Sequence, residues 1–248
     1  MKIAVCISSV PDTTSKINFR ENSTKFDTTG IQFVINPYDE FGLTKAMMLK
    51  EKTGGQLTVI TVGDVSVEPV IRKALAIGAD AGVRINATPT DSYSTAKAIC
   101  SYLKENPVDL IIAGRESIDY NGGAVGGMIA EILDIPFVNA CNGLEMDGNT
   151  AKLSREIDGG KEKLSANLPF IIGGQKGLVE ESELRIPNMR GIMQARSKPL
   201  TIVDPSSDEN LTSSENFKKP AEKGTCKLIE AGNEAELVSL LQSEAKVI

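Results

Sequence analysis

The residues best suited to chemistry form a glycine-rich stretch at positions 113–127, Ala-Gly-Arg-Glu-Ser-Ile-Asp-Tyr-Asn-Gly-Gly-Ala-Val-Gly-Gly. It follows an apolar run at 109–112 that favours a buried strand, and it precedes residues 128–133, which are typical of a helix. Small residues at this junction let a ligand approach the backbone, and the first N–H groups of a helix attract anions. The stretch therefore indicates a site for an anion such as a nucleotide phosphate. Since it lacks a Walker lysine and the dinucleotide-binding glycine spacing, a tight turn whose glycines only ease packing remains an equal alternative.

Histidine is absent from the 248 residues, which removes the commonest general base and the commonest metal ligand. Catalysis by Ser-His-Asp or Cys-His groups is therefore excluded. The four cysteines, Cys6, Cys100, Cys141 and Cys226, form no C-x-x-C pair, and the sequence predicts no metal site. We expect all four to be buried as small apolar side chains.

The overall composition narrows the class of partner. The net charge of −6 argues against binding to nucleic acid or to an anionic membrane surface. Hydrophobic residues make up 41% and charged residues 24%, which is typical of a soluble globular protein. No apolar run approaches the roughly 20 residues that a membrane helix needs, and the first apolar segment is too short for a signal peptide. We therefore expect a cytoplasmic protein without membrane insertion.

The elements that must position the glycine-rich stretch alternate between strand and helix. Strand patterns occupy residues 2–8, 31–35, 56–62, 81–85 and 109–113. Helix patterns occupy residues 36–52, 67–77 and 90–105. This alternation predicts an α/β fold, a doubly wound and mostly parallel sheet with helices on both faces. Since such sheets bind ligands at the carboxyl ends of their strands, we expect the residues after strands 2–8, 56–62 and 109–113 to share one crevice.

Two of the helix starts have clear capping signals. Asn36 followed by Pro37 is a strong start, with the Asn36 side chain as the expected cap and Asp39 and Glu40 complementing the helix dipole. Thr90 or Asp91 is the expected cap of the helix at 90–105.

The second half of the chain has a different pattern. Turn signals at 144–149 and 158–160 accompany strand patterns at 152–156 and 161–166, which predicts a small antiparallel β portion. A last strand pattern follows at 168–172.

The end of the chain is predicted to be an arm. Residues 204–223 are rich in Ser, Asn, Lys and Glu and are typical of an exposed linker, and residues 234–245 have the pattern of an amphipathic helix. We therefore divide the chain into a nucleotide-binding α/β domain, 1–203, and a polar linker with a C-terminal helical arm, 204–248. The arm's apolar stripe of Leu237, Leu240 and Leu241 must dock either on its own domain or on a partner, and we expect it to dock on a partner subunit.

Several ordered motifs resemble the β subunit of electron-transfer flavoproteins over essentially the whole chain. The most specific is Arg-Glu-Ile-Asp-Gly-Gly-Lys-Glu-Lys-Leu at 155–164 with Pro-Phe-Ile-Ile at 169–172, which resembles the family's signature segment. Further similar segments are Val-Cys-Ile at 5–7, Val-Pro-Asp at 10–12, Asn-Pro at 36–37, Ala-Leu-Ala-Ile-Gly-Ala-Asp at 74–80, Gly-Arg-Glu-Ser-Ile-Asp at 114–119 and the loop at 184–193.

This resemblance implies a heterodimer with an α subunit that holds most of the redox-active FAD. The β subunit would shield the flavin and, in the common branch of the family, bind AMP. The dimer would accept electrons from flavin dehydrogenases, such as acyl-CoA dehydrogenases, and pass them to a membrane quinone reductase or another acceptor. We therefore expect a carrier subunit and not an enzyme, because the cofactor supplies the redox chemistry.

The resemblance also assigns the AMP-binding positions. They are Cys6, Asn36, Pro37, Tyr38, Asp39, Val62, Gly114, Arg115, Glu116, Ser117, Ile118, Asp119, Tyr120, Asn121, Gly122, Gly123, Ala124 and Val125. The last four replace polar side chains of the common branch, and a Thr and a Gln of the electron-bifurcating branch are also missing. AMP, a second FAD and an empty crevice therefore remain open, although backbone N–H groups at 121–126 can hold phosphate without side chains. Asn36 as a simple helix cap and Asp119 as a turn residue are the alternatives to their ligand roles.

A partner-recognition loop is implied as well. Its residues are Leu184, Arg185, Ile186, Pro187, Asn188, Met189 and Arg190. We expect Ile186 to be an exposed apolar anchor, with burial in its own domain as the alternative. Arg155 with Glu156 and Asp158 is expected to form a structural salt-bridge cluster.

Two further function classes remain. One is the β subunit of an electron-bifurcating flavoprotein, which binds its own FAD and oxidises NADH. The other is a universal-stress-like nucleotide-binding module that acts alone.

Overall fold

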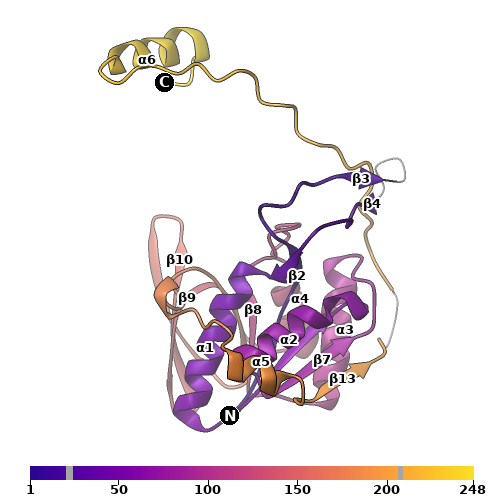
Figure 1. Cartoon of the computed structure of the whole chain (residues 1–248). Coiled ribbons are helices and arrows are strands. Elements are labelled where there is room, and N and C mark those ends of the chain that lie inside the picture. Colours follow the sequence, from indigo (N-terminus) through magenta and orange to yellow (C-terminus); the bar gives the residue numbers. More distant parts are fainter. Residues whose placement is uncertain (21–24, 206–208) are drawn as a thin grey trace.

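The computed structural model describes residues 1–20, 25–205 and 209–248, and its centre is a nine-stranded sheet (Figure 1). The strand order is β11-β10-β9-β12-β8-β1-β6-β7-β13. The strands are β1 (Lys2–Cys6), β6 (Gln56–Val62), β7 (Ala81–Ile85), β8 (Leu110–Gly114), β9 (Phe137–Asp147), β10 (Thr150–Ile157), β11 (Gly160–Asn167), β12 (Phe170–Gly174) and β13 (Leu200–Val203). Two small antiparallel pairs lie outside this sheet, β2 (Ser9–Pro11) with β5 (Phe33–Ile35) and β3 (Phe19–Arg20) with β4 (Lys25–Phe26).

Most of the sheet is parallel, as the strand–helix alternation predicts. Every neighbouring pair from β9 through β12, β8, β1, β6 and β7 to β13 is parallel. The strands β9, β10 and β11 are antiparallel and extend one edge of the sheet. The predicted fold class and the predicted antiparallel portion are therefore confirmed.

Helices cover both faces of this sheet. The long helices are α1 (Pro37–Thr53), α2 (Glu68–Ile77), α3 (Ser92–Glu105) and α4 (Val125–Leu133), and a short helix α5 (Met189–Ala195) packs beside α2. The buried side chains of β1 alternate between the two faces: Ile3 and Val5 pack in the core under α1 and α2, while Ala4 and Cys6 pack in the core under α3 and α4. Because of this alternation, the four consecutive buried residues of β1 contribute side chains to the cores on both faces of the sheet.

The structure differs from the sequence prediction at several elements. The helix expected at 128–133 begins at Val125, so its first turn includes the end of the glycine-rich stretch. The turn expected at 144–149 is confined to Gly148 and Asn149, because β9 continues to Asp147. The strand β13 was not predicted, although its residues Leu-Thr-Ile-Val favour a strand, and it pairs with β7.

The C-terminal arm leaves the sheet and its covering helices altogether. The helix α6 (Glu234–Leu240) and the π-helical turn Leu241–Ala245 lie at the far end of an extended segment (Figure 1). The predicted arm helix is therefore present, and it stands apart from the α/β domain. None of the helices within the described ranges is long and apolar enough to cross a membrane.

Candidate functional site

The residues expected to share a crevice end three adjacent strands. In the register of the sheet, Cys6 lies beside Ile60 of β6, and Val5 lies beside Ile112 of β8. The ends of β1, β6 and β8 therefore meet at one edge, which brings together Cys6, Val62 and Gly114. Cys6 is buried, whereas Val62 and Gly114 are half-buried and border the surface.

Asp39, in the first turn of α1, joins two loops at this edge. One oxygen of its buried carboxyl group accepts from the N–H of Ser8 at 2.7 Å, and the other accepts from the N–H of Gly114 at 2.8 Å. Ser8 follows β1 and Gly114 ends β8. The carboxyl group therefore fixes the exits of both strands.

Asn36 fixes the following part of the same edge. Its side-chain amide donates to the carbonyl of Glu116 at 2.9 Å, and its side-chain oxygen accepts from the N–H of Ile118 at 3.2 Å. Its backbone carbonyl accepts from the N–H groups of Asp39 and Glu40 and so begins α1. The expectation that the Asn36 side chain caps α1 is wrong, because that side chain is engaged by the loop after β8.

Burial changes the acidity of two groups at this edge. Desolvation raises the pKa of Asp39 to about 7 against the opposing effect of its hydrogen bonds with Ser8, Asn36 and Gly114, and nearby Asp119 adds to the rise. Burial likewise raises the pKa of the Cys6 thiol far above its ordinary value. Cys6 is therefore a neutral wall of the crevice and not a nucleophile.

The end of β8 is close-packed because residue 114 has no side chain. A Cβ atom there would overlap the Asp39 carboxyl oxygen and would lie 2.9 Å from the Cβ of Tyr38 and 3.1 Å from the side-chain nitrogen of Asn36. The Asn-Pro-Tyr-Asp segment and the strand end therefore contact each other directly. Pro37 occupies the first turn of α1, where its missing N–H is not needed.

The loop from β8 to α4 turns through two left-handed residues. Asn121 has φ 51° and Gly123 has φ 59°, a region in which asparagine and glycine are tolerated best. Asp119 and Tyr120 are exposed on the outer part of the loop. The helix then begins after Ala124, whose methyl side chain cannot accept hydrogen bonds, so the first N–H groups of α4 remain for an anion.

Arg115 extends the loop toward the antiparallel part of the sheet. Its guanidinium donates to the side-chain oxygen of buried Gln175 at 3.3 Å, and Gln175 donates to Glu156 at 3.1 Å. Glu156 also accepts from Asn142 at 3.3 Å. The Arg115 side chain is thus engaged just beyond the carboxyl end of β12, which lies beside the end of β8. Gln175 was not predicted; its position directly after a strand was the one signal that could have identified it.

The prediction that Arg155 pairs with Glu156 and Asp158 is wrong, because Arg155 and Glu156 each have other partners. Arg155 forms an ion pair with Glu162 at 2.6 Å, directly across the β10–β11 ladder. Glu156 contacts Asn142 and Gln175 instead. Neighbouring residues on a strand point to opposite faces, so Arg155 and Glu156 cannot share one partner easily.

The predicted partner-recognition residues form a separate surface. Ile186 is 83% exposed, and Met189 and Met193 are exposed beside it. Asn188 caps α5 by accepting from the N–H of Gly191 at 2.8 Å. The loop is held on α1, because Arg185 donates its N–H to Thr44 and pairs with Glu51 at 2.9 Å. The alternative that Ile186 is buried in its own domain is therefore wrong.

This surface lies away from the crevice. Lys198, just beyond α5, donates to the carbonyls of Leu75 and Ala79, at the end of α2 that leads into β7. That end of α2 faces the amino edge of the sheet, opposite the carboxyl ends that form the crevice. The structure therefore does not bring the two predicted sites together.

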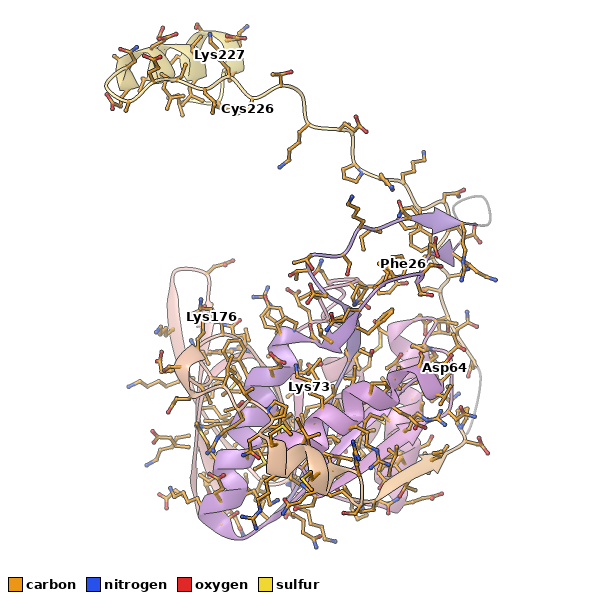
Figure 2. The ribbon with its side chains drawn as sticks, in the orientation of Figure 1. Phe26, Asp64, Lys73, Lys176, Cys226 and Lys227 are labelled. Carbon is orange, nitrogen blue, oxygen red and sulfur yellow. The ribbon has the colours of Figure 1, made fainter. Side chains whose placement is uncertain are left out.

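One cysteine differs from its predicted environment. Cys6, Cys100 and Cys141 are buried as expected, and burial raises the pKa of both Cys100 and Cys141 to about 11. Cys226 is exposed on the extended C-terminal segment, far from the sheet (Figure 2). The arm contributes no core in which Cys226 could be buried.

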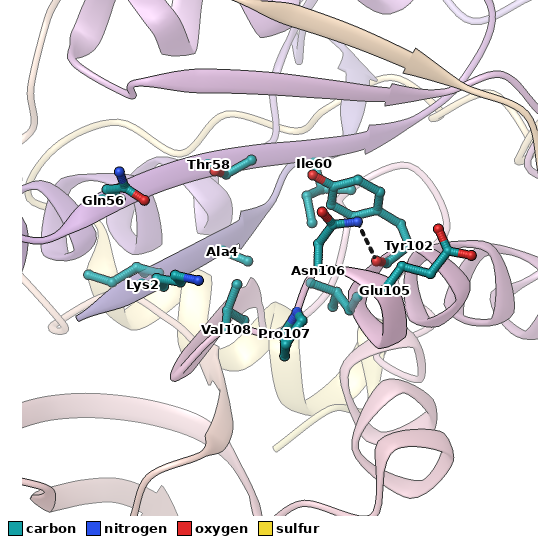
Figure 3. Close-up of a pocket in the computed structure, with 12 residues that line it drawn as sticks. Lys2, Ala4, Gln56, Thr58, Ile60, Tyr102, Glu105, Asn106, Pro107 and Val108 are labelled. Atoms are coloured by element: carbon teal, nitrogen blue, oxygen red, sulfur yellow. Dashed lines mark hydrogen bonds between the residues drawn. The ribbon is translucent and has the colours of Figure 1, made fainter.

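A cavity of about 260 Å³ lies at the amino edge of the sheet (Figure 3). Lys2 and Ala4 of β1, Gln56 and Thr58 of β6 and Tyr102 of α3 line it, among others. It contains none of the predicted nucleotide positions. The crevice at the carboxyl ends therefore remains the candidate nucleotide site.

Comparison with known proteins bears on the whole chain. Residues 23–208 match the family model described as "Electron transfer flavoprotein domain". The chain is 37% identical, over the full length of both proteins, to "Electron transfer flavoprotein subunit beta" of Bacillus subtilis. It is 35% identical to the protein of the same name from Syntrophomonas wolfei, over 90% of this chain and 87% of that protein. It is also 31% identical to "Acryloyl-CoA reductase electron transfer subunit gamma" of Anaerotignum propionicum, over 82% of this chain and 78% of that protein.

Proposed function

The chain belongs to the electron transfer flavoprotein family, and from this premise we propose that it is the β subunit of a heterodimeric electron carrier. The observation that carries the proposal is the 37% identity across the full length of a relative named as a β subunit. An α subunit would hold most of the FAD, which supplies the one-electron and two-electron chemistry when bound. This chain would shield the flavin and provide docking surfaces. The absence of histidine agrees with a role that needs no general base.

Co-expression with an electron-transfer flavoprotein α subunit from the same organism tests this assignment. We expect a stable heterodimer that is yellow from bound flavin and is reduced by a flavin dehydrogenase such as an acyl-CoA dehydrogenase. A chain that remains a homodimer or monomer beside that subunit would contradict the assignment and would favour a nucleotide-binding module acting alone.

We also propose that the crevice holds AMP. The support is a helix start whose N-cap residue cannot accept hydrogen bonds, preceded by a loop held in place by Asn36 and Asp39. Backbone N–H groups at 122–126 would bind the phosphate, since that of Asn121 donates to the Ser117 carbonyl at 2.8 Å, while Cys6, Val62 and Tyr38 would form walls for the nucleoside. Since the polar side-chain atoms of Asn36 and Asp39 are already engaged, these two residues would act by positioning the loop.

Replacing Gly123 with valine is expected to abolish nucleotide binding. Its φ of 59° is strained for a β-branched residue, so the loop must change its path. Nucleotide released from the purified heterodimer by heat and quantified by chromatography measures the effect. The matched control is Gly148→Val, with φ 60° in the β9–β10 turn, which should leave the content unchanged. Full nucleotide content in Gly123→Val would show that the loop is not the cradle.

A second candidate is a subunit of an electron-bifurcating flavoprotein, with its own FAD in the same crevice. It is favoured by the 31% identity to the acryloyl-CoA reductase electron transfer subunit and by the small residues Gly122 to Val125, which leave room for a larger ligand. The absorption spectrum of the heterodimer separates the two candidates. One FAD per heterodimer with AMP supports the carrier, and two FAD with NADH oxidation support bifurcation.

Ile186 is proposed as the apolar anchor for redox partners on the exposed loop 184–190. Ile186→Ala should weaken binding to a cognate dehydrogenase by about 1–3 kcal/mol, a common cost for a central interface residue. Melting temperature and flavin content should change little, because the side chain is exposed. Val65→Ala, at another exposed apolar position, is the control. Electron-transfer rates measured over a range of dehydrogenase concentrations show whether binding is weakened. Wild-type rates in Ile186→Ala would exclude Ile186 as the anchor.

The C-terminal arm, residues 204–248 with the helix α6, is proposed to dock on the α subunit through that helix. The helix α6 stands apart from the α/β domain (Figure 1). Leu237 and Val238 on it are exposed in the single chain. We place the working heterodimer in the cytoplasm, passing electrons to a membrane quinone reductase or another acceptor.

A further inference from the structure

The segment between β13 and α6 is attached to the domain at its near end. The carboxyl oxygen Oδ2 of Asp91 accepts from the N–H of Leu211 at 2.7 Å, from the N–H of Thr212 at 2.9 Å and from the Thr212 hydroxyl at 3.3 Å. Lys97, two turns along α3, forms an ion pair with Glu209 at 2.6 Å. These contacts join residues more than 110 positions apart in the sequence.

A second attachment lies further along the same segment, at the β3–β4 hairpin. The ring of Phe217 stacks on the ring of Phe19, with centroids 5.2 Å apart and planes at 15°. The Lys219 ammonium group donates to the side-chain oxygen of Asn18 at 2.6 Å. Figure 1 shows the extended segment passing beside β3 and β4 before it continues to α6.

The two oxygens of Asp91 have separate tasks. Oδ1 accepts from the N–H of Ser94 at 2.7 Å and so caps α3, while Oδ2 holds the C-terminal segment. The N–H donors, that of Ser94 first, keep the pKa of Asp91 below its usual range. The carboxylate is therefore charged whenever the protein is folded near neutral pH, which strengthens the hydrogen bonds that it accepts.

We propose that Asp91 and the Phe19–Phe217 stack position the partner-binding arm by fixing the point at which it leaves the domain. We call residues 209–219 with these contacts the arm clamp. This inference rests on the proposed docking of α6 on the α subunit.

The physical consequence is a shorter tether. With the clamp closed, about 15 residues connect Lys219 to α6 and reach roughly 50 Å when extended. With the clamp open, the free chain starts near Asp204 and is about twice as long, so the effective concentration of α6 at its docking surface falls. The clamp also directs α6 from the end of the molecule that carries the β3–β4 hairpin.

Asp91→Asn separates capping from clamping. Asparagine caps helices well through its side-chain oxygen, but its NH₂ group then faces the N–H donors of Leu211 and Thr212. Phe217→Ala removes the second attachment without touching α3. The matched controls are Asp64→Asn, the same change at the cap of Val65–Val67, and Leu228→Ala, an exposed residue beyond the clamp.

Limited trypsin digestion of the full chain measures how often residues 209–219 detach from the domain. Cleavage between Lys218 and Lys219 should be about tenfold faster in Asp91→Asn and in Phe217→Ala. The reason is that cleavage follows the population of the detached segment, which rises by about this factor when one or two hydrogen bonds to a charged group, or a comparable contact, are lost. Cleavage between Lys223 and Gly224, beyond the clamp, should be unchanged. Melting temperatures should stay near the wild-type value, since α3 keeps its cap.

The affinity of the chain for the α subunit tests whether the arm clamp promotes docking of α6. The double variant Asp91→Asn with Phe217→Ala should bind roughly threefold more weakly, because a tether of twice the length lowers the effective concentration of α6 by about that factor. Unchanged trypsin cleavage in both single variants would overturn the clamp, and faster cleavage with unchanged affinity would overturn its role in docking. A wild-type chain that does not bind the α subunit would refute the proposed function instead, while the digestion would still decide whether the clamp exists.

Discussion

Replacing Asp39 with alanine is expected to lower the free energy of unfolding by about 2–6 kcal/mol, since two partly buried N–H groups each lose an acceptor at about 1–3 kcal/mol. Those groups belong to Ser8 and Gly114, at the exits of β1 and β8. Denaturant titration of the full chain measures the loss. Asp27→Ala, at an exposed turn where the carboxylate accepts from Thr29, is the control and should cost well under half as much. Equal losses in the two variants would show that Asp39 does not join the strand exits.

The pH dependence of the same measurement has a defined sign. Burial raises the folded-state pKa of Asp39 from 3.8 to about 7, so between these two values the folded chain keeps a proton that the unfolded chain has lost. Stability from this group is therefore full below about pH 4 and decreases as the pH rises to about 7. Asp39→Asn cannot titrate and should lack this component. Identical pH profiles in the wild type and Asp39→Asn would contradict the raised pKa.

Among additions of a single methyl group in the candidate site, Gly114→Ala is expected to reduce stability and nucleotide binding the most. The new Cβ would overlap the Asp39 carboxyl oxygen and crowd Tyr38, so the strand end or the start of α1 must move. We expect a loss of about 1–3 kcal/mol in stability, a typical cost of overpacking, together with loss of the bound nucleotide. Both are measured on the purified heterodimer, by thermal unfolding and by nucleotide release.

Gly122→Ala is the matched control for this prediction. A Cβ atom at residue 122 would meet only the Ser92 hydroxyl, at 3.7 Å, which is an ordinary contact. This variant should retain both stability and nucleotide. If Gly114→Ala behaves like Gly122→Ala, the strand end is not held by close packing against Asp39.

The sequence was sufficient to predict the α/β architecture because the parallel strands carry their own signal. The apolar runs that became β1, β6, β7 and β8 are buried on both faces, and helices with regular apolar spacing separate them. The short strand β13 was missed although Leu-Thr-Ile-Val favours a strand locally. What no local pattern reveals is that it pairs with β7, a contact of high sequence separation.

The sequence predicted which segments meet at the candidate site, but not what their side chains do. Asn36 is of a residue type that commonly caps helices. Its side chain instead bonds to Glu116 and Ile118, which only the three-dimensional path of the loop after β8 brings near it. That the Arg115 side chain donates to Gln175, beyond the end of β12, could not be predicted from spacing either. Such choices depend on distances between distant segments, so they lie beyond propensity and spacing.

The linker illustrates a different limit. Its polar composition predicts an exposed chain, and most of it is exposed. Composition does not show that Leu211 and Thr212 offer their N–H groups to Asp91, or that Phe217 finds a second ring on Phe19. A few contacts suffice to hold a segment that has no core of its own.

The strand β11 forms one margin of the described sheet, and its outer backbone groups are available to any extended chain that comes near. Such a margin invites self-assembly into continuous intermolecular sheets, above all while newly made chains are crowded together. Lys161 and Lys163 stand exposed on β11, and like charges would be pressed together if two copies joined there. We therefore expect these lysines to disfavour pairing between copies at this edge.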